Sequence, residues 1–296
     1  MNVFNSKYFV FIISAGRTGT RFLGEDLSKM IEDSFSVHEP DVITLKKGYN
    51  LIDKLLNFGL YQVVLGKILG KTGIRNLSQN YVSGQLDLSQ LIQKIKKHRQ
   101  KFYEKIKEEL IVESYSGWFG CIDAIKELYE NYKIVIITRD PRDWITSVIN
   151  WGSLYGKNDW LSHLGISRLN PKLINDKEYI NVWDNFTRFE KLCWTYKTYY
   201  EIMIKESRGL KTVKLFKFED LFSSENYYEQ WPIFLRFITS FDNKCFNFRI
   251  FDSLLKKKSH FSKRNIFPKY DEWEKRHKKT LKRICNDISN RLGYKL

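Results

Sequence analysis

The feature that most restricts the fold of this chain is the alternation of short, continuously apolar segments with segments of helical periodicity. The segment 8–14 (YFVFIIS) is apolar and rich in β-branched and aromatic residues, as are strands buried on both faces of a parallel sheet. Four similar strands are predicted at 34–39, 110–113, 133–138 and 213–218. Because helical patterns separate these strands, we predict a three-layer α/β/α fold with a central parallel sheet.

The length of 296 residues suits one large domain, so we treat 1–296 as a single domain with a helical insertion at about 42–110. One face of a long helix in this insertion is predicted from Leu88, Leu91, Ile92, Ile95, Phe102, Ile106 and Leu110. Two later helices are predicted from apolar residues between Trp183 and Ile204, and between Trp273 and Leu292.

The formal charge of +16 favours anionic partners, such as nucleotides, sulfated or phosphorylated compounds, nucleic acid or an acidic membrane. A well-solvated, lysine-rich surface would account for the charge equally well. The stretch 51–69 is apolar with flanking lysines, which allows peripheral contact with a membrane or a lipid-linked acceptor. The composition does not define an oligomeric state.

The four cysteines are widely separated, which indicates free thiols in a reducing compartment rather than a disulfide framework or a zinc site. The apolar run 8–13 is too short to span a membrane and lacks the features of a secretory signal. We therefore expect a cytoplasmic protein.

A turn rich in glycine and hydroxyl groups, 15–21 (AGRTGTR), joins the first predicted strand to a helix. Backbone N–H groups and the helix dipole favour an anion there, and Gly16 and Gly19 allow close approach of the backbone. Side-chain donors are added by Arg17, Thr18, Thr20 and Arg21. The turn thus predicts a site for a phosphate-like group, the alternative being a tight turn with exposed arginines. The NTPase pattern G-x-x-x-x-G-K-[ST] is absent.

A second polar segment, 138–147 (TRDPRDWITS), follows the fourth predicted strand. In doubly wound sheets ligands bind at the carboxyl ends of the strands, so the two turns can face one ligand. If Pro141 begins the helix, Ser147 lies about two turns along it and can join Arg139 in binding a second phosphate. Alternatively, Arg139 forms a capping salt bridge with Asp140, and Ser147 is a buried helix serine.

Together these segments resemble the sulfotransferase family that depends on 3′-phosphoadenosine-5′-phosphosulfate (PAPS), especially its carbohydrate-type and bacterial branch. The segment SAGRTGTRFL resembles the family's 5′-phosphosulfate loop, in which the matching positions are Arg17, Thr18, Gly19 and Thr20. The segment TRDPRDWITSVINW resembles its 3′-phosphate element, with Arg139 and Ser147. The resemblance implies a P-loop-like fold, PAPS as co-substrate and no metal ion.

Weaker similarities concern three other parts of the chain. The segments FKFEDLF at 216–222 and LGY at 292–294 are similar to the family's late strand and last turn. The family's later 3′-phosphate loop would correspond to a segment with Lys263 and Arg264, although a solvated loop fits equally well. Three tryptophans could stack on sugar faces, although such residues more often belong to the core: Trp151, Trp160 and Trp183.

The catalytic base is expected at the end of the second strand. Carbohydrate-acting members of the family carry a glutamate near this position and small-molecule members use a histidine from elsewhere, so Glu39 is the first candidate and His38 the second. Glu113 is a further alternative. Strand alternation predicts that His38 and Glu39 point to opposite faces. A structural interpretation pairs Glu39 with Arg17 or Arg21.

The resemblance implies transfer of a sulfuryl group from PAPS to a hydroxyl or amine of an acceptor, such as a carbohydrate or a glycolipid. Glu39 would take the acceptor proton and Arg17 would neutralise the departing phosphate. One alternative is an ATP-dependent kinase for a nucleoside or small molecule, which would bind ATP with Mg²⁺. The other is a nonenzymatic nucleic-acid-binding protein, which only the net charge favours, so no nucleic-acid partner is expected.

Overall fold

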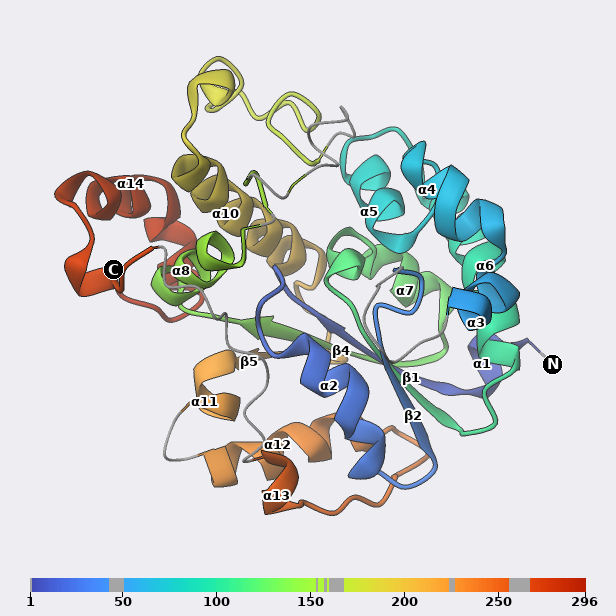
Figure 1. Ribbon diagram of the computed structural model, residues 1–296. Helices are drawn as coiled ribbons and strands as arrows, with labels where there is room; N and C mark the ends of the chain where they lie inside the picture. Colours follow the sequence, from blue (N-terminus) through green and yellow to red (C-terminus); the bar gives the residue numbers. More distant parts are fainter. Residues whose placement is uncertain are drawn as a thin grey trace.

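The computed structural model describes residues 2–42, 51–152, 154–156, 159, 168–223, 227–255 and 267–296. Its centre is a parallel sheet of five strands in the order β2-β3-β1-β4-β5 (Figure 1). The strands are β1 Tyr8–Ile13, β2 Ser34–His38, β3 Leu110–Ser114, β4 Asn131–Thr138 and β5 Val213–Lys217. All five lie where the apolar runs predict them, and the predicted α/β fold is confirmed.

Helices occupy most of the remaining described chain. The α-helices are α1 Val3–Ser6, α2 Thr20–Asp26, α3 Leu51–Phe58, α4 Gly66–Ile68, α5 Ile74–Val82, α6 Leu88–Glu104, α7 Ile122–Leu128, α8 Pro141–Trp151, α10 Arg188–Glu206, α11 Phe218–Phe222, α12 Tyr227–Thr239, α13 Asp252–Leu255 and α14 Lys275–Arg291. Short 3₁₀ or π turns are η1 Leu27–Lys29, η2 Tyr61–Leu65, η3 Ser116–Gly120, η4 Trp183–Asn185 and η5 Tyr270–Glu272. No helix in the described ranges is long and apolar enough to cross a membrane.

Alternate residues of each strand enter two separate cores, one on each face of the sheet. From β1, Phe9, Phe11 and Ile13 pack against residues of α6, α7, α8, α10 and α14. Val10 and Ile12 point to the other face, where they pack with residues of α2 and α12. Figure 1 shows α2, α11, α12 and α13 below the sheet and the larger group of helices above it. This arrangement gives the three layers expected from continuously apolar strands.

Three helix boundaries differ from the sequence prediction. α6 ends at Glu104, so Ile106 lies beyond it and Leu110 begins β3. α10 begins only after a capping box in which Thr187 and Glu190 exchange hydrogen bonds, so Trp183 precedes it in η4. α14 likewise begins after Trp273. In each case an apolar residue packs into the core from a turn beside the helix, which periodicity alone does not distinguish.

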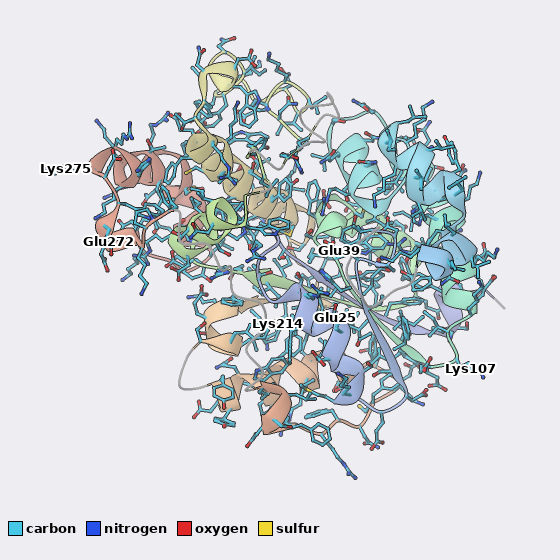
Figure 2. The ribbon with its side chains drawn as sticks, viewed as in Figure 1. Glu25, Glu39, Lys107, Lys214, Glu272 and Lys275 are labelled. Carbon is cyan, nitrogen blue, oxygen red and sulfur yellow. The ribbon has the colours of Figure 1, made fainter. Side chains whose placement is uncertain are left out.

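The positive charge is spread over the surface. In Figure 2, for example, Lys107 and Lys275 lie at opposite sides of the molecule, and both are exposed. A field of this kind favours anionic partners in general without marking one face.

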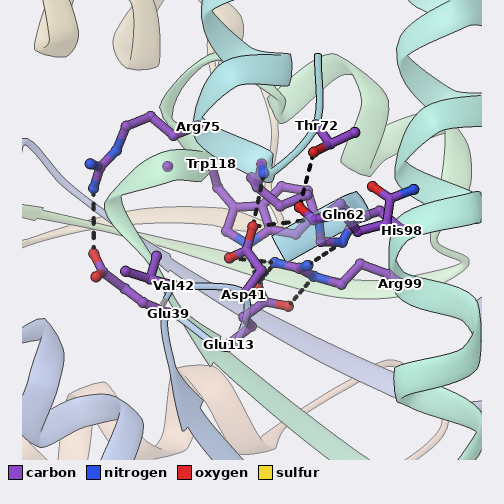
Figure 3. A network of polar contacts seen from close by, with 12 residues as sticks. Glu39, Asp41, Val42, Gln62, Thr72, Arg75, His98, Arg99, Glu113 and Trp118 are labelled. Carbon is purple, nitrogen blue, oxygen red and sulfur yellow. Dashed lines mark hydrogen bonds and ion pairs between the residues drawn. The ribbon is translucent and has the colours of Figure 1, made fainter. Parts of the chain in front are cut away.

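The helices α3 to α6 between β2 and β3, which we call the insertion, are joined to the sheet by a buried ion pair between Arg99 of α6 and Glu113 of β3 (Figure 3). Arg99 Nη2 donates to Glu113 Oε1 at 2.6 Å and Arg99 Nε donates to Oε2 at 3.1 Å. Tyr103 Oη and Trp118 Nε1 donate to the same carboxylate at 2.7 and 2.9 Å. Glu113 is 1% exposed and both its oxygens are engaged, so its suggested role as a base is wrong: it is a structural anion.

Asp41 extends this network from the end of β2. Its Oδ1 lies 3.6 Å from Arg99 Nη2, its Oδ2 accepts from the Ile74 amide at 3.2 Å, and its carbonyl accepts from Lys67 Nζ at 2.9 Å. Burial would raise the pKa of Asp41, but the charges of Lys67 and Arg99 outweigh burial and hold it below its ordinary value. Burial and Arg99 lower the pKa of His98 to about 3, so its ring is neutral.

We predict that Arg99→Met lowers the free energy of unfolding by about 3–5 kcal/mol, because Glu113 would remain buried without its cation. Urea denaturation would measure the change. Lys172→Met is a matched control, because it breaks a 2.7 Å pair with Asp184 whose side chains are 55% and 74% exposed. Such exposed pairs contribute about 0–1 kcal/mol. An effect of Arg99→Met no larger than the control would contradict the structural role of the network.

Candidate functional site

The turn after β1 is coiled tightly around the hydroxyl of Ser14. Gly16, Arg17 and Gly19 have left-handed φ angles of 83°, 57° and 74°. Ser14 Oγ accepts from the Gly16 amide at 2.9 Å and from the Thr18 hydroxyl at 2.7 Å. Glycine adopts such angles without strain, and the non-glycine Arg17 adopts one here because the surrounding contacts hold it.

The turn leads directly into α2. Among the described residues, the backbone N–H groups of Thr18, Gly19 and Thr20 have no protein acceptor. The first N–H groups of a helix lack partners within the helix, and their partial positive charge favours an anion. The local geometry therefore suits the phosphate-like ligand that the sequence predicts.

Three hydrogen bonds join the turn after β1 to the segment that follows β4, one to its turn and two to α8. Arg139 Nη1 donates to the carbonyl of Arg17 at 2.7 Å, and Trp144 Nε1 donates to the carbonyl of Gly16 at 2.8 Å. Arg17 Nε donates to Ser147 Oγ at 3.2 Å. The two segments singled out from the sequence thus lie side by side at the carboxyl ends of neighbouring strands.

The arginines of these two turns form a cationic centre. Burial lowers the pKa of Arg17, and the charge of Arg139 lowers it further. Burial also lowers the pKa of Arg139, which Asp143 and Glu219 partly offset. The guanidinium of Arg139 lies 4.4 Å from the centre of the Phe218 ring, and its buried Nε has no hydrogen-bond partner among the described residues. A bound anion would offset the repulsion between the two arginines and the cost of burying their charges.

Arg139 does not form the alternative salt bridge with Asp140. Asp140 instead caps α8, which begins at Pro141 as predicted. Its Oδ1 accepts from the amide of Arg142 at 2.8 Å and from Arg142 Nε at 2.9 Å. The cap occupies the carboxylate of Asp140 and so leaves the guanidinium of Arg139 for other contacts.

Three residues that sequence reasoning did not assign to the site hold the second turn. Glu219 accepts from the Asp140 amide and from Tyr294 Oη, both at 2.8 Å. Tyr196 Oη donates to the carbonyl of Arg139 at 2.7 Å. Glu219 and Tyr294 lie in the segments 216–222 and 292–294, whose sequences are similar to parts of the sulfotransferase family and could have pointed to them. Nothing in the sequence marks Tyr196 apart from its helical spacing.

Other predicted ligands are placed differently. The Thr18 hydroxyl is buried and donates within the turn, so its side chain does not face a ligand. Arg21 Nε donates to Glu25 at 2.8 Å, one turn along α2. The side chain of Arg21 is 39% exposed in this pair. Lys263 and Arg264 lie outside the described residues.

Glu39 and His38 follow an unexpected geometry at the end of β2. Glu39 has a left-handed φ of 45°, so the alternation of strand side chains stops at His38. His38 Nε2 lies 4.0 Å from Glu39 Oε2, and both side chains are 21% exposed. The prediction that they point to opposite faces is therefore wrong. His38 Nδ1 lies 2.9 Å from the Ser114 carbonyl, which favours a proton on Nδ1 and leaves Nε2 as an acceptor.

The partner of Glu39 is Arg75 of α5. Their Oε1 and Nη2 atoms are 3.6 Å apart (Figure 3), and the Arg75 guanidinium also lies 5.7 Å from the centre of the Tyr115 ring. An arginine does pair with Glu39, but it is neither Arg17 nor Arg21, the candidates proposed from the sequence. The insertion thus supplies a charge to the end of the second strand.

Ser114 links this end of β2 to the first turn. Its Oγ donates to the Thr20 carbonyl at 2.8 Å, and its own carbonyl accepts from the Glu39 amide at 3.3 Å. Figure 2 shows Glu39 near the middle of the molecule, between the insertion helices and α2. The candidate base is therefore separated from the β1 turn by a single strand, β3.

The three tryptophans considered for sugar binding have different surroundings. Trp183 is 8% exposed and packs against Trp194 with ring centres 5.0 Å apart, so it belongs to the core. Trp160 lies outside the described residues. Trp151, at the end of α8, is 52% exposed, and the Arg17 guanidinium lies 5.3 Å from its ring centre. Trp151 is therefore the one of the three that the structure places beside the site.

The side chains that could bind metals are dispersed. Within the described part of the chain, no group of three or more His, Cys, Asp or Glu side chains is arranged to hold a metal ion. All four cysteines are free thiols, of which Cys245 is exposed.

Solved structures to which the chain is similar include three sulfotransferases. The sulfotransferase domain from the curacin biosynthetic pathway is 14% identical, with a TM-score of 0.42 over 98% of this chain and 99% of that chain. The sulfotransferase from Alicyclobacillus acidocaldarius is 14% identical, with a TM-score of 0.40 over 98% and 97%. The sulfotransferase domain from the Synechococcus PCC 7002 olefin synthase is 11% identical, with a TM-score of 0.44 over 99% and 96%. No family model and no curated protein matches the chain.

The two glycines of the first turn give a test of its packing. A Cβ at Gly19 would lie 2.6 Å from the Phe222 ring, whereas one at Gly16 would meet nothing within 4 Å. Both have positive φ, so Gly16→Ala should lower the free energy of unfolding by about 1–2 kcal/mol through backbone strain alone. We predict that Gly19→Ala costs about 1–3 kcal/mol more, because the ring must also move.

Urea denaturation of both variants would measure the difference. Phe222→Leu in the Gly19→Ala background should recover part of the loss, because it removes the clashing ring atoms. Equal stabilities of the two alanine variants would show that Phe222 does not close against the turn.

Proposed function

We propose that the protein transfers a sulfuryl group from PAPS to a hydroxyl or amine of an acceptor. The observation that carries this proposal is the convergence of Arg17, Arg139 and Ser147 at the ends of β1 and β4. PAPS carries a phosphosulfate at one end of its ribose and a phosphate at another. Two cationic turns held against each other suit a ligand with two anionic groups.

Each turn has a separate task in this proposal. Arg17 and the free amides of the first turn would bind the 5′-phosphosulfate, and Arg139 with Ser147 would bind the 3′-phosphate. The unpartnered Nε of Arg139 supports this assignment, because a buried guanidinium N–H without an acceptor is costly. The 3′-phosphate contact would distinguish PAPS from ATP.

The proposed chemistry is a single in-line displacement. The acceptor oxygen would form a bond to sulfur while the bond from sulfur to the bridging phosphate oxygen breaks. Arg17 would neutralise the charge that develops on that departing oxygen, and Glu39 would take the proton of the acceptor hydroxyl. Arg75 would orient the Glu39 carboxylate through their ion pair. The free Nε2 of His38 keeps this residue as the alternative base.

A carbohydrate or the sugar of a glycolipid is the proposed acceptor. Trp151 supports this choice, because its exposed ring lies beside Arg17, and aromatic rings form platforms for the apolar faces of sugars. The half-exposed ring also leaves an open face for a bulky acceptor.

Two other functions are less well supported. A kinase of similar architecture would need the lysine and Mg²⁺-binding hydroxyl of the NTPase pattern, but Gly19 is followed by Thr20 and Arg21. A nucleic-acid-binding protein is favoured by net charge alone, and its positive side chains are spread around the molecule. Strongly salt-dependent binding to mixed-sequence DNA would favour that function.

A thermal-shift comparison tests the nucleotide. Adenosine 3′,5′-bisphosphate should raise the melting temperature more than AMP or ATP with Mg²⁺, because a ligand that binds only the folded state stabilises it. Arg139→Ala should remove the preference for the bisphosphate over AMP, which corresponds to about 1.5–3 kcal/mol for a charge-assisted contact. Arg142→Ala is the matched control, because Arg142 pairs with Asp140 and should leave the preference intact. A preference for ATP would instead favour the kinase.

The base can be tested with two isosteric changes. Glu39→Gln keeps the side-chain shape but removes the base, so turnover of PAPS with a saccharide acceptor should fall about 10²–10⁴-fold. Binding of adenosine 3′,5′-bisphosphate should persist. His38→Gln is the paired control and should keep most of the activity. Loss of activity in His38→Gln but not in Glu39→Gln would identify the histidine as the base.

A further inference from the structure

The outer side of the insertion carries an unusual concentration of exposed apolar side chains. We call it the apolar stripe, which comprises Ile52, Leu56, Leu60, Leu65, Ile68 and Leu69, each between 49% and 62% exposed. Of the other large exposed hydrophobic residues of the described chain, Tyr61 lies in the same segment and the rest are dispersed over several elements, for example Val182, Leu215 and Ile233. Isolated exposed residues are ordinary, whereas a contiguous apolar surface indicates a contact with something apolar.

Two lysines of the same segment, Lys54 and Lys67, point inward. Lys67 Nζ donates to the carbonyl of Asp41 at 2.9 Å, and Lys54 Nζ donates to the carbonyl of Val42. Lys54 is only 3% exposed, and burial lowers the pKa of both lysines. Figure 3 shows Asp41 and Val42, whose carbonyls accept these bonds, within the polar network. A helix that borders water normally has the reverse arrangement, with its lysines outside and its leucines inside.

The stripe is carried by α3 and by η2 with α4, and α3 contacts η2. Ile52 and Leu56 are one turn apart on α3, and Leu65 of η2 and Leu69, just after α4, are also one turn apart. Gly59, with φ of 79°, turns the chain between them. In Figure 1, α3 and α4 lie beside α6 at the edge of the molecule.

A row of lysines borders the stripe. Four exposed lysines follow one side of α6 and its C-cap at i,i+3 and i,i+4 spacing: Lys94, Lys97, Lys101 and Lys105. Lys105 Nζ donates to Asn57 Oδ1 at 2.7 Å, which places the end of this row against the end of α3. Lys71, just beyond α4, is also exposed. Apolar side chains bordered by cations match the boundary between acyl chains and anionic headgroups.

We propose that the apolar stripe and the α6 lysines form a docking surface for a bilayer that contains anionic lipids. The leucines and isoleucines enter the headgroup and acyl boundary while the lysines contact lipid phosphates. The charge of the lysine row favours this occupant over a second copy of the chain, whose lysines would repel it. The proposal concerns a surface outside the nucleotide site and does not depend on the reaction proposed above.

The test is co-sedimentation of the full chain with vesicles of phosphatidylcholine alone or mixed with phosphatidylglycerol. We expect binding to the mixed vesicles that weakens as salt is added, and little binding to phosphatidylcholine alone. The double variant Leu56→Asp, Leu65→Asp should bind the mixed vesicles about tenfold more weakly. Both residues are more than half exposed, so the variant should retain the wild-type melting temperature.

Ile233→Asp is the matched control, because Ile233 is a 43% exposed aliphatic residue of α12, on the other face of the sheet. Its vesicle binding should equal that of the wild type. Absence of binding to both vesicle types, or equal loss in the control and the double variant, would overturn the proposal. So would a wild-type dimer that the double variant converts to a monomer, because the stripe would then be an interface between copies.

Discussion

The buried ion pair of Arg99 with Glu113 determines how the insertion meets the sheet. Two hydrogen bonds join the guanidinium to the carboxylate, and both groups are buried, so α6 cannot shift along β3 without leaving an unpaired charge. Asp41 joins the same cation from the chain that follows β2. The end of β2, with Glu39, is thereby held close to the insertion that supplies Arg75.

A second constraint acts at the carboxyl ends of β1 and β4, where the like charges of Arg17 and Arg139 approach each other. Two hydrogen bonds hold them in place. Arg139 donates to the carbonyl of Arg17, and Glu219 accepts from the Asp140 amide in the turn after β4. The fold therefore maintains an electrostatically unfavourable pair by surrounding hydrogen bonds. Such preorganised charge is useful where an anion binds or develops during a reaction.

The strands and the two turns could be predicted from the sequence, because local signals specify them. Continuous apolar runs mark buried parallel strands, and glycines with hydroxyl and basic residues mark turns that can bind anions. The pairing of Glu39 with Arg75 could not be predicted, since it joins residues far apart in sequence through the packing of the insertion. The rule that strand side chains alternate between the two faces assumes extended backbone, so it does not apply at Glu39, whose φ is left-handed. The predicted helix boundaries were wrong where an apolar residue of a turn, such as Trp273, continues the helical spacing of the sequence although its backbone is not helical.

The inner and outer sides of the insertion follow from one electrostatic requirement. Asp41 is a buried carboxylate, and a buried anion must be surrounded by cations and donors. Lys67 is drawn inward to it, and Lys54 is drawn to the neighbouring carbonyl of Val42. With these lysines facing the network, the side chains that remain exposed on the described part of the same segment include the six leucines and isoleucines of the stripe. The exposed apolar stripe is thus the counterpart of the buried charge, and a substitution that frees the lysines would change both sides of the insertion together.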